Sequence, residues 1–492
     1  MFMSLTVLPK LKKVKTMYKK SILKWVGLAF VSLTYTACSL PNLVQRTANT
    51  AVPATFNNSQ DTTNTAKMKW KEFFTDPNLT ALIDTALQHN QELNITLQEI
   101  QIAQNEVRAR KGEYLPFVGL RGGAGVDKVA RYTNIGAMEA TTDIKPEKEI
   151  PEPLPDFMVG AYATWEVDIW HKLHNAKRAA LSRYLSSVEG KNFMVTNLIA
   201  EIANSYFELL ALDNQLAIVK QNIEIQNNAL QIVKLQKEAT RVTELAVRRF
   251  QAQVLNTQSL QYNIQQRITE TENRINFLVG RYPQPVQRNN QAFDNLIPKP
   301  IQAGIPAQLL SNRPDIKQAE LELAAAKLDV KVAKAMFYPS LGISAGIGYQ
   351  AFNPTYLLKP ESLLYTLAGD LAAPLVNKNA IKSVFNSANA KQIQAVYNYE
   401  RTILNANMEV ANQLAKISNL EKSFNLKSQE VEALTQSIDI SNNLFRSARA
   451  DYMEVLLTQR DALESRFDLV ETRMQQMNAM VDIYRALGGG WN

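Results

Sequence analysis

Histidine and cysteine are scarce in this chain, which has three histidines and one cysteine in 492 residues. The cysteine, Cys38, has no histidine near it in sequence, so a thiol and imidazole catalytic pair is not expected. No glycine-rich phosphate loop follows an expected strand. These absences argue against an enzyme and against a bound cofactor.

Metal ligands are equally sparse. His171 and His174 come just after an expected strand without a cluster of carboxylates or cysteines, so a zinc site is not expected there. Met474, Met477 and Met480 could suggest copper passage, but their helical spacing favours packing in a core. The sequence therefore predicts no metal site.

Glycine and proline are also few for this length, at 18 and 19 residues, which indicates long uninterrupted elements. From 173 to 239 there is no proline and one glycine, and from 381 to 448 there is neither. A helix of 68 residues is roughly 100 Å long. Breaks at 239–245 and 448–455 end these two rods, and a helix of about half the length follows each.

Apolar side chains in the first rod recur at spacings of three and four residues, which is typical of a coiled-coil seam. The positions are Leu198, Ile202, Tyr206, Leu209, Leu212 and Leu216. A rod with one apolar stripe needs neighbouring helices along its whole length.

The net charge of +8 is concentrated at the N-terminus, where residues 1–37 contain seven lysines and no acidic residue. Without these lysines, the charge of the remaining chain is about +1. A basic surface for nucleic acid is therefore not expected, and nucleic acid is excluded as a partner.

The N-terminal segment resembles a bacterial lipoprotein signal. Lys19, Lys20 and Lys24 precede a short apolar run, and the small residues Thr36 and Ala37 lead into Cys38. We expect a signal peptide at 1–37, with Met17 as an alternative start, and a lipidated Cys38 that opens a polar tether at 38–67. The alternative is a buried free cysteine behind a short anchor helix, but the apolar run is too short to span a bilayer.

Four stretches alternate apolar residues with small or polar ones, which predicts strands at about 117–127, 158–169, 340–350 and 362–373. Residues 128–156, which end in a proline-rich and acidic stretch, are expected to be an irregular exposed loop. In the second strand the charges lie on one face, and Trp165 lies near the end of the other. This pattern suits a wall between water and lipid.

The chain contains an internal duplication. A constant shift of 223 residues superimposes two copies of a helix followed by a strand. The shift places Pro116, Gly119, Gly123 and Gly125 on Pro339, Gly342, Gly346 and Gly348. The expected organisation is a first repeat at 68–285, a linker at 286–312 and a second repeat at 313–492.

Each repeat supplies two strands and enough helix for two long columns. Four strands cannot close a barrel, and open strand edges are not viable in lipid, so membrane-embedded strands require an oligomer. Three copies would supply twelve strands and twelve helical columns. The competing interpretation is a soluble coiled-coil protein whose hairpins form ordinary sheets.

Four motifs in this order resemble the outer-membrane factor family, the TolC-like channels of Gram-negative tripartite efflux pumps. They are WEVDIW at 165–170, RPDIKQAE at 313–320, APLVNK at 373–378 and RALGGGW at 485–491. The resemblance covers 68–491 and is greatest to the lipoprotein branch typified by OprM and NodT. One local departure is His171, where the family commonly has glycine.

The resemblance implies an α+β membrane protein that forms a homotrimer. Its twelve-stranded outer-membrane β-barrel would continue as a long α-helical barrel in the periplasm. The implied partners are outer-membrane lipid, a periplasmic membrane-fusion adaptor and an inner-membrane pump of the RND type. The implied function is an exit duct for drugs or other small toxic compounds, with type I protein secretion or metal-ion efflux as alternatives.

On this mapping two helix turns form the periplasmic tip that contacts the adaptor. The residues expected there are Arg241, Val242, Thr243, Glu244, Ala450, Asp451, Tyr452 and Glu454. Asp451 and Arg460 are gate candidates, as part of an ionic latch or an acidic ring. The alternative is that they are solvated charges on exposed turns.

Overall fold

The computed structural model describes most of the chain, in two compact units. Cys38 and the expected signal peptide at 1–37 lie outside the described residues. Unit 1 contains Gln104–Ser182 and Leu323–Ala395, and unit 2 contains Thr47–Ala103, Arg183–Glu322 and Val396–Asn492. The described residues are 41, 43–44, 46–56, 61–145, 147–289, 293, 302–447 and 449–491.

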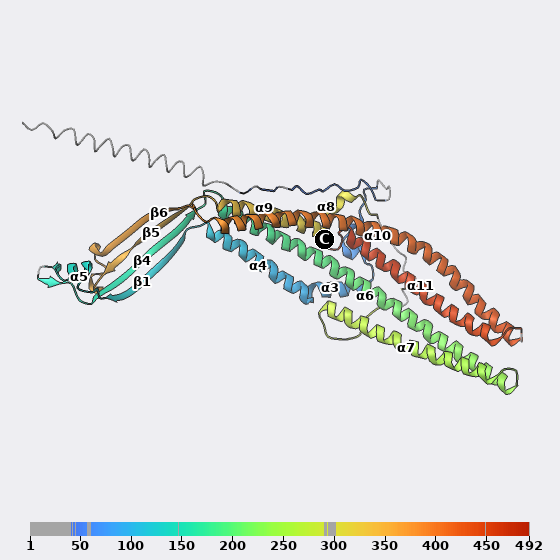
Figure 1. Cartoon of the computed structure of the whole chain (residues 1–492). Helices are drawn as coiled ribbons and strands as arrows, with labels where there is room; N and C mark the ends of the chain where they lie inside the picture. Colours follow the sequence, from blue (N-terminus) through green and yellow to red (C-terminus); the bar gives the residue numbers. More distant parts are fainter. Residues whose placement is uncertain are drawn as a thin grey trace, which may run out of the picture. The chain divides into compact units, whose positions relative to one another are not determined.

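Unit 1 is built on a four-stranded antiparallel sheet with the order β1-β4-β5-β6 (Figure 1). The strand expected at about 158–169 begins earlier, at Leu154. It ends at Val167, because Asp168 leaves the sheet to cap the following helix. The strands are β1 (Phe117–Asp127), β4 (Leu154–Val167), β5 (Ser340–Ala351) and β6 (Leu363–Ala372).

The register of this sheet aligns the apolar faces of all four strands. Residues directly opposite one another in antiparallel strands project to the same face. The pairs that establish the alignment are Leu120 with Ala161, Ala161 with Ile347, and Ile347 with Tyr365. One face of the sheet is therefore apolar throughout, and the other carries the small and polar residues.

The small-residue face includes a close approach between β4 and β5. Gly160 lies directly opposite Gly348. A Cβ atom on Gly348 would lie 2.5 Å from the carbonyl oxygen of Val159, so any larger residue would push the two strands apart.

The segment between β1 and β4 is more ordered than the sequence predicted. It contains the short helix α5 (Asn134–Glu139) and a small hairpin of β2 (Asp143–Lys145) with β3 (Lys148–Glu149). The side chain of Thr133 accepts a hydrogen bond from the backbone of Gly136 and caps the helix. The expectation of an irregular loop over 128–156 is therefore wrong.

Long helices dominate the rest of the structure. The two rods are α6 and α10, and after each the chain reverses into a helix of about half the length (Figure 1). Among the described residues, no helix combines the length and the apolar character needed to cross a membrane. The bounds are α3 (Pro77–His89), α4 (Gln91–Glu113), α6 (Lys172–Glu238), α7 (Glu244–Val279), α9 (Pro314–Ala335), α10 (Asn379–Arg446) and α11 (Tyr452–Ala486).

Helices α3 and α4 are separated at Asn90, which has an extended backbone conformation. The Asn90 side chain accepts a hydrogen bond from the Leu93 amide at 2.8 Å and donates one to the Leu278 carbonyl at 2.9 Å. Asparagine is a favoured N-cap because its side chain replaces a missing helical partner. The break thus caps α4 and anchors it to the end of α7.

Short helices precede α3, and others lie between α7 and α9. Helix η1 (Thr65–Lys67) and α2 (Trp70–Phe73) precede α3, and η3 (Pro306–Gln308) and α8 (Leu309–Asn312) lie within the expected linker. The remaining short helices, η4 (Pro354–Tyr356) and η5 (Pro360–Ser362), connect β5 to β6.

The main core of unit 2 joins α3, α6 and the C-terminal part of α11. Phe73 stacks on Tyr484 with ring centroids 4.2 Å apart. The hydroxyl of the buried Tyr206 donates to a carboxylate oxygen of Asp76 at 2.8 Å. Other fully buried members are Leu79, Ile83, Ile202 and Leu209.

A buried arginine from the RPDIKQAE motif connects three parts of unit 2. Arg313 pairs with Asp315 and Glu409, each at 2.7 Å, and donates to the carbonyl oxygen of Ala486 at 2.8 Å. Burial opposes its charge, but the two carboxylates outweigh that effect and raise its pKa. Because a buried charge without partners is costly, this motif depends on both carboxylates.

A second core lies beside the two helix turns of unit 2, and we call it the turn cluster. Val242 and Tyr452, which are half-buried, pack against it from the two turns. Its buried members are Leu230 and Val233 of α6, Ala246, Val247, Phe250 and Val254 of α7, and Val455 of α11. The two turns therefore share one apolar core.

Phe250 is the largest side chain in the turn cluster and is 1% exposed. We expect Phe250→Ala to cost about 3–5 kcal/mol in local stability, because it removes a buried ring and leaves a cavity. Amide hydrogen exchange by mass spectrometry should become faster in 229–254 and around Tyr452. The matched control is Phe277→Ala in the same helix, since Phe277 is 71% exposed. Equal exchange in the two variants would contradict the shared core.

Candidate functional site

The apolar face of the sheet is the first candidate functional surface. Large apolar side chains project from it without covering, and Leu120 and Leu367 are 86% and 79% exposed. A continuous patch of this kind is unusual on a soluble protein and matches the lipid-facing band of a membrane β-barrel. The exposed members on the four strands are Val118, Leu120, Val126, Val159, Trp165, Ile347, Leu363, Tyr365, Leu367 and Leu371.

The outer edges of the sheet are the second feature. In the four-stranded sheet, β1 pairs with β4 and β6 pairs with β5, so each outer strand has one neighbour. The remaining edge of each outer strand presents backbone donors and acceptors along about ten residues. Such an edge is suited to pairing with a strand of another chain.

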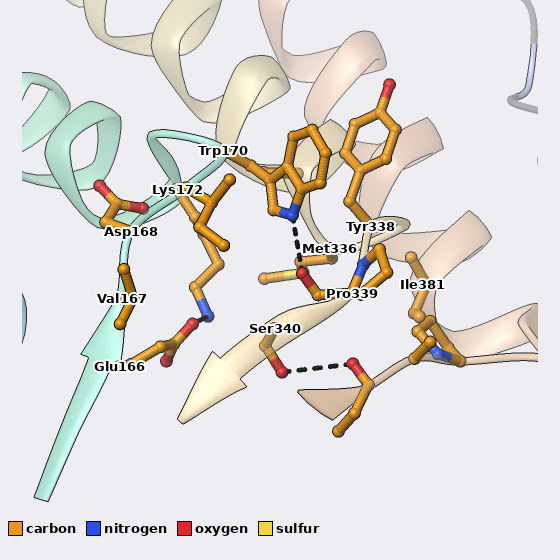
Figure 2. A pocket seen from close by; sticks show the side chains of 15 residues that line it. Glu166, Val167, Asp168, Trp170, Lys172, Met336, Tyr338, Pro339, Ser340 and Ile381 are labelled. Carbon is orange, nitrogen blue, oxygen red and sulfur yellow. Dashed lines mark hydrogen bonds and ion pairs between the residues drawn. The ribbon is translucent and has the colours of Figure 1, made fainter. Parts of the chain in front are cut away.

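Two tryptophans lie where β4 ends and α6 begins. Trp165 donates from Nε1 to the carbonyl oxygen of Tyr114 at 3.0 Å. Trp170 donates to the carbonyl oxygen of Pro339 at 2.7 Å and stacks on Tyr338 with centroids 4.7 Å apart (Figure 2). Tryptophans that combine an apolar ring with a satisfied N–H are typical of the boundary between lipid and water.

Figure 2 shows a cavity of about 460 Å³ between the end of β4 and the end of α9. Glu166 pairs with Lys172, and Trp170 binds the backbone of Pro339. Among the other labelled side chains, Val167, Met336 and Ile381 are apolar, whereas Asp168, Tyr338 and Ser340 are polar. The cavity lies where the strands meet the helices.

Asp168 organises the turn between β4 and α6. Its carboxylate accepts hydrogen bonds from the Leu173 and His174 amides at 3.0 and 2.8 Å, and lies 2.6 Å from His174 Nδ1. Burial alone would raise the pKa of Asp168, but the hydrogen bonds from His174 and Leu173 outweigh burial and lower it. The carboxylate is thus held ionised at the start of α6.

The sequence has no cluster of carboxylates or cysteines beside His171 and His174, but a single carboxylate lies with them in the structure. Asp168, His171 and His174 follow one another at intervals of three residues, and the turn brings their side chains together. The expectation of no zinc site did not take this single carboxylate into account. The D-x-x-H-x-x-H spacing is the signal that indicates the cluster.

The structure places the expected tip residues on the two helix turns of unit 2. Val242 and Tyr452 come together on the turn cluster, and Ala450 is half-buried. The remaining five residues are exposed: Arg241, Thr243, Glu244, Asp451 and Glu454. The turns therefore combine a shared apolar interior with a charged exterior.

The charges at the turns differ in how firmly they are held. Glu244 pairs with Lys237 across the first turn and with Arg248 at 2.8 Å, and these contacts lower its pKa. Asp451 occupies the N-cap position of α11, where its side chain makes no capping hydrogen bond. The gate candidate Arg460 binds its neighbour Asp461 at 2.8 Å.

Sequence reasoning missed two buried glutamines near the turn cluster. Gln226 in α6 and Gln459 in α11 are each 1% exposed. Among the described residues, neither amide group has a hydrogen-bond partner. Gln459 also lines a cavity of about 170 Å³ with Phe250 and Phe445. Unpaired buried polar groups are destabilising, so both glutamines weaken this part of unit 2.

Comparison with known proteins gives consistent matches over nearly the whole chain. The family model described as outer membrane efflux protein matches residues 82–281 and 305–489. The chain is 29% identical over 423 residues to the pyoverdine export outer membrane protein OpmQ of Pseudomonas aeruginosa, covering 86% of this chain and 87% of that protein. It is 26% identical over 466 residues to the cation efflux system protein CusC of Escherichia coli, with 94% and 97% covered.

Among solved structures, the open state of the Neisseria gonorrhoeae MtrE outer membrane channel matches with a TM-score of 0.80. The two share 21% identity, and the match covers 92% of this chain and 99% of that one. This likeness shows the fold. The family resemblance that rested on motifs such as WEVDIW and RPDIKQAE is confirmed. The chain belongs to the outer membrane efflux protein family.

Proposed function

We propose that three copies of this chain form the exit duct of a tripartite efflux pump and passively conduct drugs or other small toxic compounds out of the cell. The observation that carries the proposal is the four-stranded sheet of unit 1. One face of this sheet carries exposed apolar side chains, and the other carries small and polar ones. Each outer strand pairs with only one other strand of the sheet. A closed barrel with lipid outside and water inside accounts for all three features.

Closure of the barrel requires pairing between chains. Four strands supply too little circumference, and β1 of one chain pairing with β6 of the next would remove every edge. Three chains give the twelve-stranded barrel of a homotrimer. The small residues on the inner face, including the Gly160 and Gly348 pair, leave room for a water-filled passage.

The helices supply the periplasmic part of the duct. The rods α6 and α10 contain 67 and 68 residues and are each roughly 100 Å long. In both proposed repeats, 68–285 and 313–492, a helix leads through a proline into the first strand of a pair, from α4 to β1 and from α9 to β5. Six such rods, with the shorter helices beside them, would line a helical barrel.

The compound that passes is selected elsewhere in the assembly. OpmQ is named for pyoverdine export and CusC for cation efflux, although this chain resembles both over most of its length. One duct architecture thus serves unlike cargos, which favours selection by an RND-type pump and its adaptor. Metal-ion efflux is the alternative cargo class, and the similarity to CusC favours it.

The exposed charges of the two helix turns form the docking surface for the adaptor, and Asp451 and Arg460 are gate residues. The turns combine exposed Thr243, Glu244 and Asp451 with the buried apolar residues of the turn cluster. This arrangement suits a contact between proteins.

The lipid-facing role of the sheet is tested by placing an arginine on either face of the same strand. Leu367→Arg puts a cation on the apolar face of β6, and Ala368→Arg puts it on the opposite face. We expect Leu367→Arg to cost about 2–4 kcal/mol per chain, because the position is near the middle of the strand, and Ala368→Arg much less. The measurement is the amount of heat-dissociable trimer in outer-membrane fractions, with native mass in detergent. Equal losses in both variants, or a one-chain mass for the unmodified protein, would contradict the barrel.

The proposed lipid anchor is tested by mass spectrometry of the mature N-terminus. We expect the unmodified chain to begin at a lipidated Cys38 and to fractionate with the outer membrane. Cys38→Ala should remove the lipid and slow processing while leaving the barrel able to assemble. A mature chain that keeps residues N-terminal to Cys38, or a Cys38 without lipid, would rule out the anchor.

Docking is tested with a photo-crosslinking amino acid in place of Thr243 or Ala450. We expect conjugates with a periplasmic adaptor, identified by its peptides, from both positions. The matched control is the same substitution at Tyr262, which is 69% exposed in the middle of α7. Conjugates with the adaptor from Tyr262 alone would move the docking surface away from the turns.

A further inference from the structure

The turn between β4 and α6 brings together three side chains that bind metals. Asp168, His171 and His174 each offer one ligand atom, and these atoms all lie within 4.8 Å of one another. Around a tetrahedral ion with bonds of about 2.0–2.1 Å, neighbouring ligand atoms are roughly 3.3 Å apart. Small rotations of the side chains would therefore bring all three onto one ion.

Two of the three ligands are already fixed in place. The Asp168 side chain is 7% exposed and is held by the amides of Leu173 and His174. The His174 ring stacks on Tyr114 with centroids 4.4 Å apart. Metal sites depend on such neighbouring contacts, which orient the ligands before the ion arrives.

His171 is held by its backbone conformation. Its φ of 56° lies in the left-handed region, where histidine, asparagine and aspartate are the most frequent residues after glycine. The ring centroids of His171 and His174 lie 6.0 Å apart, and the ring planes are at 88°. The backbone of the turn therefore keeps His171 within reach of the other two ligands.

The surroundings permit entry of a cation. Both histidines are exposed, so an ion and the water that completes its coordination can reach the site. The nearby cations are engaged with other groups: Lys172 with Glu166, and Lys177 over the Tyr114 ring at 5.5 Å. The Asp168 carboxylate adds an oxygen ligand beside the two imidazole nitrogens.

We propose that Asp168, His171 and His174 bind one divalent transition-metal ion of the zinc type, with water in the remaining position. Two imidazoles and one carboxylate are a ligand set that suits zinc, and also copper(II) or nickel, better than magnesium or calcium. An ion bound to His174 Nδ1 takes the place of the 2.6 Å hydrogen bond between this nitrogen and Asp168, and the neutral ring then carries its one proton on Nε2. The proposal rests on these residues alone and does not depend on the efflux function.

The chain provides its own control, because it contains three histidines and the third, His89, lies outside the cluster at the end of α3. The full chain is purified in detergent without a histidine tag, stripped with EDTA and titrated with ZnCl₂ by calorimetry. We expect one zinc per chain, retained in His89→Gln. In His174→Gln and His171→Gly the affinity should fall by about tenfold or more. Glycine at 171 keeps the left-handed backbone, so that variant removes a ligand without straining the turn.

Copper(II) gives an independent measurement of the ligands. Electron paramagnetic resonance of the Cu²⁺-loaded chain should show nitrogen coupling from two imidazoles, reduced to one in His171→Gly and in His174→Gln. Thermal melting of each variant checks that the fold is intact. The proposal is overturned if the stripped chain takes up no zinc, or if His89→Gln loses as much zinc as the two cluster variants.

Discussion

Hydrogen bonding at the outer edges of the sheet is the constraint on which the architecture depends. Hydrocarbon offers no partner for a backbone N–H or C=O group, so β1 and β6 cannot remain unpaired in a bilayer. In the proposed barrel, one chain has too few strands to satisfy them. Pairing between chains would close the sheet, and the rods would then follow the same symmetry.

The two faces of the sheet are kept distinct by register as much as by composition. A shift of one residue in any strand pair would exchange its apolar and small side chains. The contact between Gly160 and Gly348 resists such a shift, because no other residue fits there without displacing the strands. Backbone proximity and side-chain chemistry therefore specify the same pairing.

Periodicity and residue scarcity predicted most of the fold from sequence. The absence of proline in the rods located α6 and α10, and alternation located the four strands, because both signals extend over many residues. The break at Asn90 and helix α5 were missed, since each depends on a single side chain that caps a helix. The packing of Val242 and Tyr452 against one cluster could not be predicted, because it brings together turns more than 200 residues apart in sequence. The Asp168 cluster was missed for a different reason: its signal is local, but only a cluster of carboxylates or cysteines was expected to indicate a metal site.

Gln226 and Gln459 have a consequence for how unit 2 comes apart. Each buried amide without a partner forfeits about 1–3 kcal/mol, whereas the charges around Arg313 are fully paired. Pairing either amide would therefore stabilise the helices beside the turns, and these helices open more easily than they would with a fully paired interior.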